Sequence, residues 1–209
     1  KAAFRGGDTH ANVDHVDQVL HDIQSHDLQS SYPAAEMLDK YPVGKFFEIT
    51  PAEFKNRDLS EYAMLIHVRF TDIRYVGNCG NPYIPESRCV GITRADLVND
   101  NGRVLFAGIV EMWVTDIDYN IILKEYEYKD IYVKEIWGSR YGDLPAEFKE
   151  TLMEYFRKKT QLRGIAEQAY EYTKSKNKLN ASYGMMVTDI AKPEIAYVNE
   201  EYITVEKEL

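Results

Sequence analysis

The longest helical pattern in the chain lies between Pro145 and Gly184, and it limits the possible folds more than any other feature. Pro145 stands where a helix tolerates proline, at the first helical position, and apolar side chains then recur at three- and four-residue steps. These side chains are Phe148, Leu152, Tyr155, Phe156 and Leu162. Gly164 interrupts the pattern, and a second helical stretch follows. The segment is predicted to form an antiparallel hairpin of two helices.

The middle of the chain carries strand and turn signals. Residues 63–70 alternate in part like a strand. Residues 99–102 read Asn-Asp-Asn-Gly, a strong hairpin signal between predicted strands at 95–98 and 103–106. A further strand is expected at 130–137. Together with the helical hairpin, this β-rich portion gives the fold class α+β.

Three shorter helices are also predicted. Thr115 and Asp118 have the spacing of a capping box ahead of residues 119–126. Residues 34–39 read as a short helix. Residues 8–26 are expected to form a solvated helix, because their histidines lack the spacing of a zinc finger or a helical metal site. Its inward side chains would be Val13, Val16, Val19, Leu20 and Ile23.

Composition narrows the class of protein. The 209 residues are 44% hydrophobic, enough for a sizeable core, and no apolar run approaches the about 20 residues that span a bilayer. The expectation is a soluble protein without membrane contact, cytoplasmic by default. A net charge of -9 argues against a general nucleic-acid coat. One local cluster of cations is the exception: Arg157, Lys158, Lys159, Arg163, Lys174, Lys176 and Lys178.

Two stretches suggest phosphate chemistry. Residues 27–33 read Asp-Leu-Gln-Ser-Ser-Tyr-Pro, where a carboxylate precedes backbone amides that can hold a metal-bound triphosphate. An ordinary turn is the alternative. In residues 176–184, Lys176, Asn180, Tyr183 and Gly184 fall on one helical face. A capped amphipathic helix is the alternative there.

In this order, the two stretches resemble motifs A and B of family B DNA polymerases. Motif A reads Asp-x-x-Ser-Leu-Tyr-Pro in that family, and Ser31 replaces its Leu here. Motif B reads Lys-x-x-x-Asn-Ser-x-Tyr-Gly, and Ala181 replaces its Ser. The resemblance implies a polymerase of the phage type. Motif C of that family follows motif B. In this chain Thr115-Asp116-Ile117-Asp118 precedes motif B, so it is in the wrong position to be motif C.

The resemblance also implies roles for individual residues. Asp27 would be the metal and catalytic carboxylate, with Lys176 as the cation on the nucleotide phosphates. Asn180 would orient the nucleotide, and Tyr183 with Gly184 would pack against the nascent base pair. The motif A residues implied in nucleotide binding are Leu28, Gln29, Ser30, Ser31 and Tyr32. Tyr32 would exclude a ribose 2′-hydroxyl, while Lys159, Arg163 and Lys174 are equally well explained as phosphate contacts or as solvated helix face.

Residues 4–7 read Phe-Arg-Gly-Gly, either a simple turn or a DNA-binding element. They are similar to the Tyr-x-Gly-Gly motif of protein-primed family B polymerases, which contacts template DNA. The implied DNA-binding residues are Phe4, Arg5, Gly6 and Gly7, although Phe4 lacks the tyrosine hydroxyl. The implied partners are DNA primer-template, deoxynucleoside triphosphates and, if priming is by protein, a terminal protein.

The resemblance divides the chain into four parts. They are a partial palm with motif A at 1–50, a β-rich insertion at 51–144, a fingers hairpin with motif B at 145–184, and a return segment at 185–209. A two-metal Mg²⁺ mechanism needs a second carboxylate, and residues 185–209 contain no Asp-x-Asp. The chain is therefore expected to be an inactive fragment without motif C or an exonuclease domain.

Three functions remain open from the sequence. The first is a piece of a DNA-directed DNA polymerase that performs deoxynucleotidyl transfer in the full-length protein. The second is a non-catalytic nucleic-acid-binding or replication-assembly module on the same scaffold. The third is an unrelated α+β domain whose motif matches are coincidental.

Overall fold

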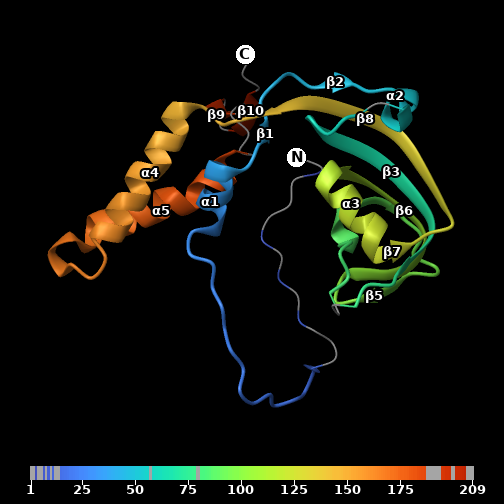
Figure 1. The fold of residues 1–209 in the computed structure, drawn as a ribbon, viewed down its shortest axis with the longest axis horizontal. Helices are drawn as coiled ribbons and strands as arrows, with labels where there is room; N and C mark the ends of the chain where they lie inside the picture. Colours follow the sequence, from blue (N-terminus) through green and yellow to red (C-terminus); the bar gives the residue numbers. More distant parts are fainter. Residues whose placement is uncertain are drawn as a thin grey trace. The chain divides into compact units, whose positions relative to one another are not determined.

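A computed structural model shows two compact units in the chain (Figure 1). The structure describes residues 3, 7, 9, 11, 15–56, 58–78 and 81–186, and the backbone of 194–198 and 201–205. We call the first unit, Lys1–Leu28 with Asp39–Pro145, the sheet unit. The second, Gln29–Leu38 with Ala146–Leu209, is the helical unit. The mixture of helices with an antiparallel sheet confirms the α+β fold class.

The sheet unit is built on three long strands. They are β3 (Tyr62–Tyr75), β6 (Arg103–Thr115) and β8 (Asp130–Gly142). The shorter elements are β1 (Tyr41–Pro42), β2 (Phe47–Glu48), α2 (Pro51–Asn56), η2 (Glu86–Arg88), β4 (Cys89–Ile92), β5 (Val98–Asp100), α3 (Asp116–Glu125) and β7 (Tyr126–Glu127). The strand order is β1-β8-β3-β6-β4, with β2 on β8, β5 on β6 and β7 on β3. These pairs are antiparallel, and β5 with β6 forms a tight hairpin, while β3 pairs with β6 and β8 over longer connections.

The core of this unit lies on one face of the sheet. Alternate residues of β3 and β6 point into it, because successive side chains of a strand face opposite sides. Its fully buried members include Ile66, Val68, Phe70, Val104 and Val110. Figure 1 shows α3 in the concave side of the curved sheet, where Ile122 completes the core.

Two local predictions in this unit are confirmed. Asp100 pairs with Arg103, and Asn101 and Gly102 both have positive φ, at 46° and 79°, as a two-residue hairpin turn requires. Thr115 caps α3: its hydroxyl accepts the Asp118 amide at 3.1 Å, and the Asp118 carboxylate accepts the Thr115 amide at 3.1 Å. Asp118 therefore has a structural role.

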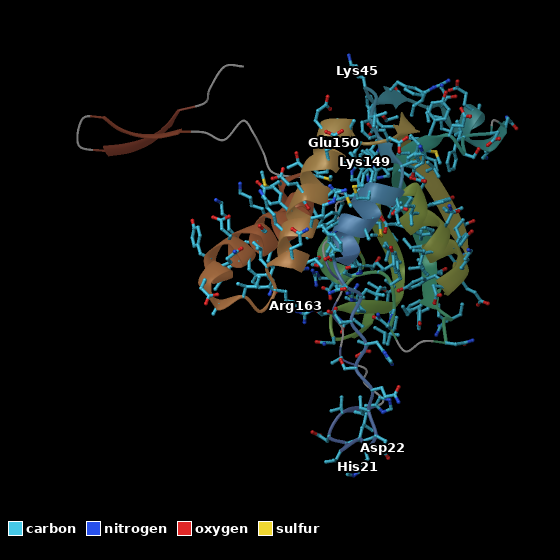
Figure 2. The ribbon with its side chains drawn as sticks, turned by 60° about the vertical axis from the view of Figure 1, so that its left-hand side comes forward. His21, Asp22, Lys45, Lys149, Glu150 and Arg163 are labelled. Carbon is cyan, nitrogen blue, oxygen red and sulfur yellow. The ribbon has the colours of Figure 1, made fainter. Side chains whose placement is uncertain are left out.

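The predicted helix over residues 8–26 is wrong for the described part. Residues 18–28 have no regular structure, and Asp17 and Asp22 are left-handed, with φ of 58° and 57°. A right-handed helix cannot continue through such residues. The expected inward side chains are exposed, Val19 to 82% and Ile23 to 69%, and Val13 lies outside the described residues. Figure 2 shows His21 and Asp22 on this irregular segment.

The helical unit confirms the predicted two-helix hairpin. Helix α4 (Ala146–Gln161) follows Pro145, and α5 (Ala169–Met185) pairs with it. Between them lie η3 (Ala166–Gln168) and Gly164, whose φ of 83° reverses the chain. Arg163 lies at this loop end of the hairpin (Figure 2). Leu152 and Leu179 are buried.

Helix α1 (Ser31–Leu38) packs on both hairpin helices, although the Asp39–Pro145 part of the sheet unit separates it from them in sequence. It begins three residues earlier than the short helix predicted at 34–39. A last antiparallel pair, β9 (Glu194–Val198) and β10 (Glu201–Val205), lies in the stretch expected to be a return segment.

Candidate nucleotide site on the helical unit

The first stretch of predicted site residues leads into α1. Asp27 and Leu28 are exposed, and Gln29 and Ser30 form a turn before the helix begins at Ser31. Ser30 is left-handed, with φ of 56°, and its carbonyl accepts the Ala34 amide at 3.0 Å. The first turn of a helix carries amides without an intrahelical acceptor, which favour anions.

The second stretch occupies the solvent side of α5. Ser175, Leu179 and Ser182 form the buried stripe of this helix. Lys176, Asn180 and Gly184 are exposed beside that stripe, and Tyr183 is half-buried. The helical period therefore presents the chemically active side chains outward while the small and apolar ones pack.

Tyr32 of α1 and Tyr183 of α5 bring the two stretches together. Their rings stack with centroids 4.7 Å apart and an interplanar angle of 27°. Tyr32 remains 42% exposed, so the pair offers an accessible aromatic surface. This contact joins the residues for which the sequence implied sugar and base-pair contacts.

A cation from α4 reaches the turn before α1. The Lys159 Nζ donates a hydrogen bond to the Ser30 hydroxyl at 2.9 Å. From the sequence, Lys159 was explained equally well as a phosphate contact or as solvated helix face. The sequence did not show that α4 lies beside Ser30, which only the folded arrangement reveals. Lys174, a similar candidate, lies 3.5 Å from Glu171 in an ion pair.

Glu36 was not anticipated as part of this region. Its side chain is fully buried, and its Oε2 lies 2.7 Å from the Ser182 hydroxyl. Burial raises the pKa of the Glu36 carboxyl above its ordinary value of 4.5, and the contact with Ser182 opposes part of that rise. The only feature of the sequence that could have indicated this residue was its position one helical turn after Tyr32.

Gly184 is open to a close approach from outside. A Cβ placed on this residue would meet no atom of the described residues within 4 Å, so none of these neighbours requires glycine there. Glycine in a helix costs about 0.5–1 kcal/mol relative to alanine. The residue is thus explained neither by packing nor by a positive φ.

The structure says little about the predicted DNA contacts at residues 4–7 and about the predicted metal site. Phe4, Arg5 and Gly6 lie outside the described residues, and Gly7 is exposed without regular structure. Across the described part of the chain, no group of three His, Cys, Asp or Glu side chains is placed to hold a metal ion. Asp27 provides a single carboxylate, which does not complete a two-metal site.

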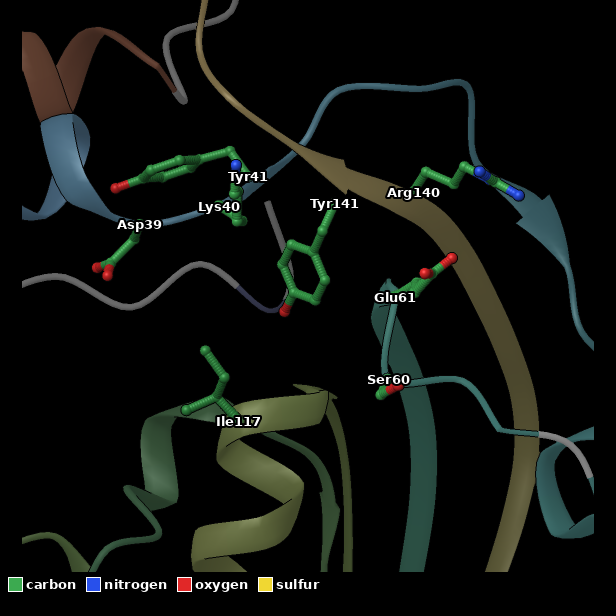
Figure 3. Close-up of a pocket in the computed structure, with 8 residues that line it drawn as sticks. All are labelled: Asp39, Lys40, Tyr41, Ser60, Glu61, Ile117, Arg140 and Tyr141. Atoms are coloured by element: carbon green, nitrogen blue, oxygen red, sulfur yellow. The ribbon is translucent and has the colours of Figure 1, made fainter.

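A separate pocket of about 790 Å³ lies in the sheet unit (Figure 3). Its lining residues are Asp39, Lys40, Tyr41, Ser60, Glu61, Ile117, Arg140 and Tyr141. None of them was a predicted site residue. The Tyr141 hydroxyl donates to Asp116 at 2.9 Å, and Asp116 also accepts the Met64 amide at 3.0 Å, so this carboxylate braces the sheet against α3.

Within the ranges that the structure describes, no helix is long and apolar enough to cross a membrane. Comparison with curated protein sequences gives no match.

Solved structures share the fold. Phi29 DNA polymerase complexed with primer-template DNA is 17% identical, with a TM-score of 0.58, and the match covers 87% of this chain and 29% of that chain. The same polymerase with primer-template DNA and incoming nucleotide substrates is 18% identical, with a TM-score of 0.56, covering 87% and 30%. The chain thus spans less than a third of the length of these polymerases.

The family comparison shows whether the two motif matches reflect membership of a polymerase family. The profile described as DNA polymerase type B, organellar and viral, matches residues 1–209. A match over the whole chain overturns the reading in which the two motifs are coincidental. The chain belongs to the organellar and viral family of type B DNA polymerases.

Proposed function

We propose that this chain supplies the surface on which a DNA-directed DNA polymerase binds the incoming deoxynucleoside triphosphate. The observation that supports this most directly is the stack of Tyr32 on Tyr183, which brings one residue of each family motif together within the helical unit. A planar, half-exposed aromatic pair suits a sugar and a base pair, since both present flat or apolar faces.

Cations and amides near Ser30 suit the triphosphate. Lys159 lies at the Ser30 hydroxyl, and the first turn of α1 contributes backbone amides. Lys176, exposed on α5, is the further cation that the family motif implies for the phosphates. Charge-assisted hydrogen bonds of this kind are about twice as strong as neutral ones.

Tyr183 and Gly184 suit the other end of the nucleotide. The open space over Gly184 admits a base pair closely, and Tyr183 supplies a ring beside it. Tyr32, exposed beside Tyr183, is proposed to lie under the deoxyribose and exclude a 2′-hydroxyl. Asn180 would orient the nucleotide.

The reaction would be deoxynucleotidyl transfer. The primer 3′-hydroxyl oxygen forms a bond to the α-phosphorus, the bond from that phosphorus to the bridging oxygen breaks, and pyrophosphate leaves. A divalent cation such as Mg²⁺, held by Asp27 and by carboxylates outside this chain, would neutralise the phosphates. Because the described residues do not complete that site, this chain alone is proposed not to extend primers.

The palm, insertion and fingers correspondences are part of the same proposal. The α4–α5 hairpin would be the fingers, and much of the sheet unit the β-rich insertion. The partners would be primer-template DNA and deoxynucleoside triphosphates. Priming by a terminal protein remains a prediction, because Phe4, Arg5 and Gly6 lie outside the described residues.

Nucleotide binding by the pure chain tests this proposal. Titration with a fluorescent deoxynucleoside triphosphate should give saturable binding that Asn180→Ala weakens. Asn177→Ala is the matched control, because it removes an exposed amide from the same helix. Equal effects of the two substitutions, or no binding at all, would contradict the assigned site.

A second measurement separates the alternative function. A non-catalytic DNA-binding module would bind primer-template DNA in a salt-dependent manner, would lose that binding on Lys176→Ala, and would be indifferent to Asp27→Ala. Under our proposal Asp27→Ala reduces the Mg²⁺-dependent part of triphosphate binding. Primer extension by the pure chain would contradict the expected inactivity.

A further inference from the structure

Glu36 is an unusual residue to find at the contact between α1 and α5. Its side chain has no exposed surface, and Ser182 is the hydrogen-bond partner that the structure gives it. Within the described residues its second oxygen, Oε1, is buried without a partner. A buried carboxylate anion with one hydrogen bond costs far more free energy than a neutral carboxylic acid in the same place.

The single proton of the Ser182 hydroxyl limits the direction of the hydrogen bond. The Ser182 Oγ lies 2.7 Å from Glu36 Oε2 and 2.8 Å from the Leu179 carbonyl oxygen. A serine hydroxyl has one proton, so it can donate to only one of these oxygens. If Ser182 donates to Leu179, both contacts are satisfied only when Glu36 is protonated and donates to Ser182. Burial raises the pKa of the Glu36 carboxyl and so favours the protonated form that this arrangement needs.

The same two helices also carry the tyrosine stack. Glu36 lies one helical turn after Tyr32 and therefore on the same side of α1, while Ser182 directly precedes Tyr183 on α5. A partly exposed ring stack and a buried hydrogen bond therefore both lie in the packed contact between these helices. Both contacts are directional, so together they restrict rotation of α1 about its axis more than apolar packing alone does.

We propose that Glu36, as a neutral acid donating to Ser182, is a positioning residue that fixes α1 against α5 with Tyr32 stacked on Tyr183. The consequence for nucleotide binding rests on the function proposed above. The arrangement of the tyrosines does not, and it can be measured without any ligand.

Proton and carbon NMR of the full chain with labelled tyrosines tests the arrangement. Tyr32→Phe and Tyr183→Phe assign the two ring signals, whose ring-current shifts report the stack. Glu36→Gln keeps a neutral donor and should retain these shifts. Glu36→Leu and Ser182→Ala remove the hydrogen bond and should move both signals towards unstacked values. Glu150→Gln on α4 is the control, an exposed glutamate of the same unit.

The ring-current shifts of the variants can also contradict the proposal. It fails if Ser182→Ala, which removes only a hydroxyl and leaves the chain able to fold, keeps both ring-current shifts. It also fails if Glu36→Gln loses them as fully as Glu36→Leu does. The carbon shift of the Glu36 carboxyl adds an independent check, because the group must titrate above its ordinary 4.5.

Nucleotide affinity of the same variants then tests the functional consequence. Glu36→Leu and Ser182→Ala should weaken binding by about two- to tenfold, the range for one lost hydrogen bond, while Glu36→Gln restores it. If the wild-type chain binds no triphosphate, the proposed function fails and the ring-current result still decides the role of Glu36. If all variants bind equally while the stack is lost, the stack does not serve the nucleotide.

Discussion

At the scale of the residue, Ser30 combines a helix start with a nearby lysine ammonium, and both favour binding of an anion. Its left-handed backbone ends the irregular segment and its carbonyl starts α1, while its hydroxyl receives the Lys159 ammonium. A lysine held at a hydroxyl keeps two further donors for phosphate oxygens. The neighbouring Lys158 instead pairs with Glu154 on its own helix.

This difference between adjacent lysines is testable. Lys159→Ala should weaken triphosphate binding about tenfold, because a charged donor to phosphate is lost. Lys158→Ala should leave binding nearly unchanged, since an exposed i,i+4 ion pair contributes little. Titrations at low and high salt measure both. Equal losses would mean that the two lysines act only as diffuse charge.

At the scale of the element, the glycine in α5 and the glycine in the β5–β6 hairpin have different structural roles. Gly102 sits in a turn with positive φ, whereas Gly184 is in a helix with open space around it. The first serves the fold and the second leaves the surface accessible. Alanine substitutions should therefore have opposite effects on stability.

We expect Gly102→Ala to destabilise the sheet unit by about 1–2 kcal/mol, because an alanine at positive φ is strained. Gly184→Ala should stabilise the helical unit by about 0.5–1 kcal/mol while weakening primer-template binding. Urea unfolding measures stability, with the fluorescence of Trp113 and Trp137 reporting the sheet unit. Unchanged DNA binding in Gly184→Ala would show that the open space is not used.

Signals within a few residues were enough to predict many elements of this fold. Pro145, the Asn101–Gly102 turn and the Thr115 capping box each act locally, so their outcome follows from the residue types. The helix predicted over residues 8–26 was wrong in its described part, because its apolar spacing alone did not reveal the left-handed Asp17 and Asp22.

Contacts between distant segments could not be predicted in the same way. The motifs indicated Tyr32 and Tyr183 separately, but their stacking depends on how α1 packs on α5. The burial of Glu36 and the approach of Lys159 to Ser30 are likewise consequences of packing. A glutamate in a short helix ordinarily predicts an exposed side chain.

At the scale of the whole molecule, the buried acid makes stability depend on pH. Its folded-state pKa is raised, so the unfolded chain releases this proton first as the pH rises. The contribution of Glu36 to stability is therefore complete below about 4.5 and is lost as the pH rises through the folded-state pKa. No charged side chain of the described helices forms an ion pair with it.

Glu36→Gln should remove this dependence. The free energy of unfolding of the helical unit should rise in the variant relative to the wild type as the pH increases from 4 towards 8. Tyrosine signals followed through urea unfolding measure it at each pH, and tryptophan fluorescence of the sheet unit is the internal control. Parallel curves for the two proteins would contradict a buried, protonated Glu36.

The interruption of the helical unit by the sheet unit has a consequence for biosynthesis. The two ends of the Asp39–Pro145 part of the sheet unit pair with each other, Tyr41 with Gly142 and Pro42 with Tyr141, so this part can close without α1 or α4. About 150 residues separate α1 from the end of α5, so at roughly 5–20 residues per second the delay on the ribosome is roughly 7–30 s. Co-translational folding would complete the sheet unit first. The tyrosines would then meet last, when the nascent chain releases α5 to the waiting α1.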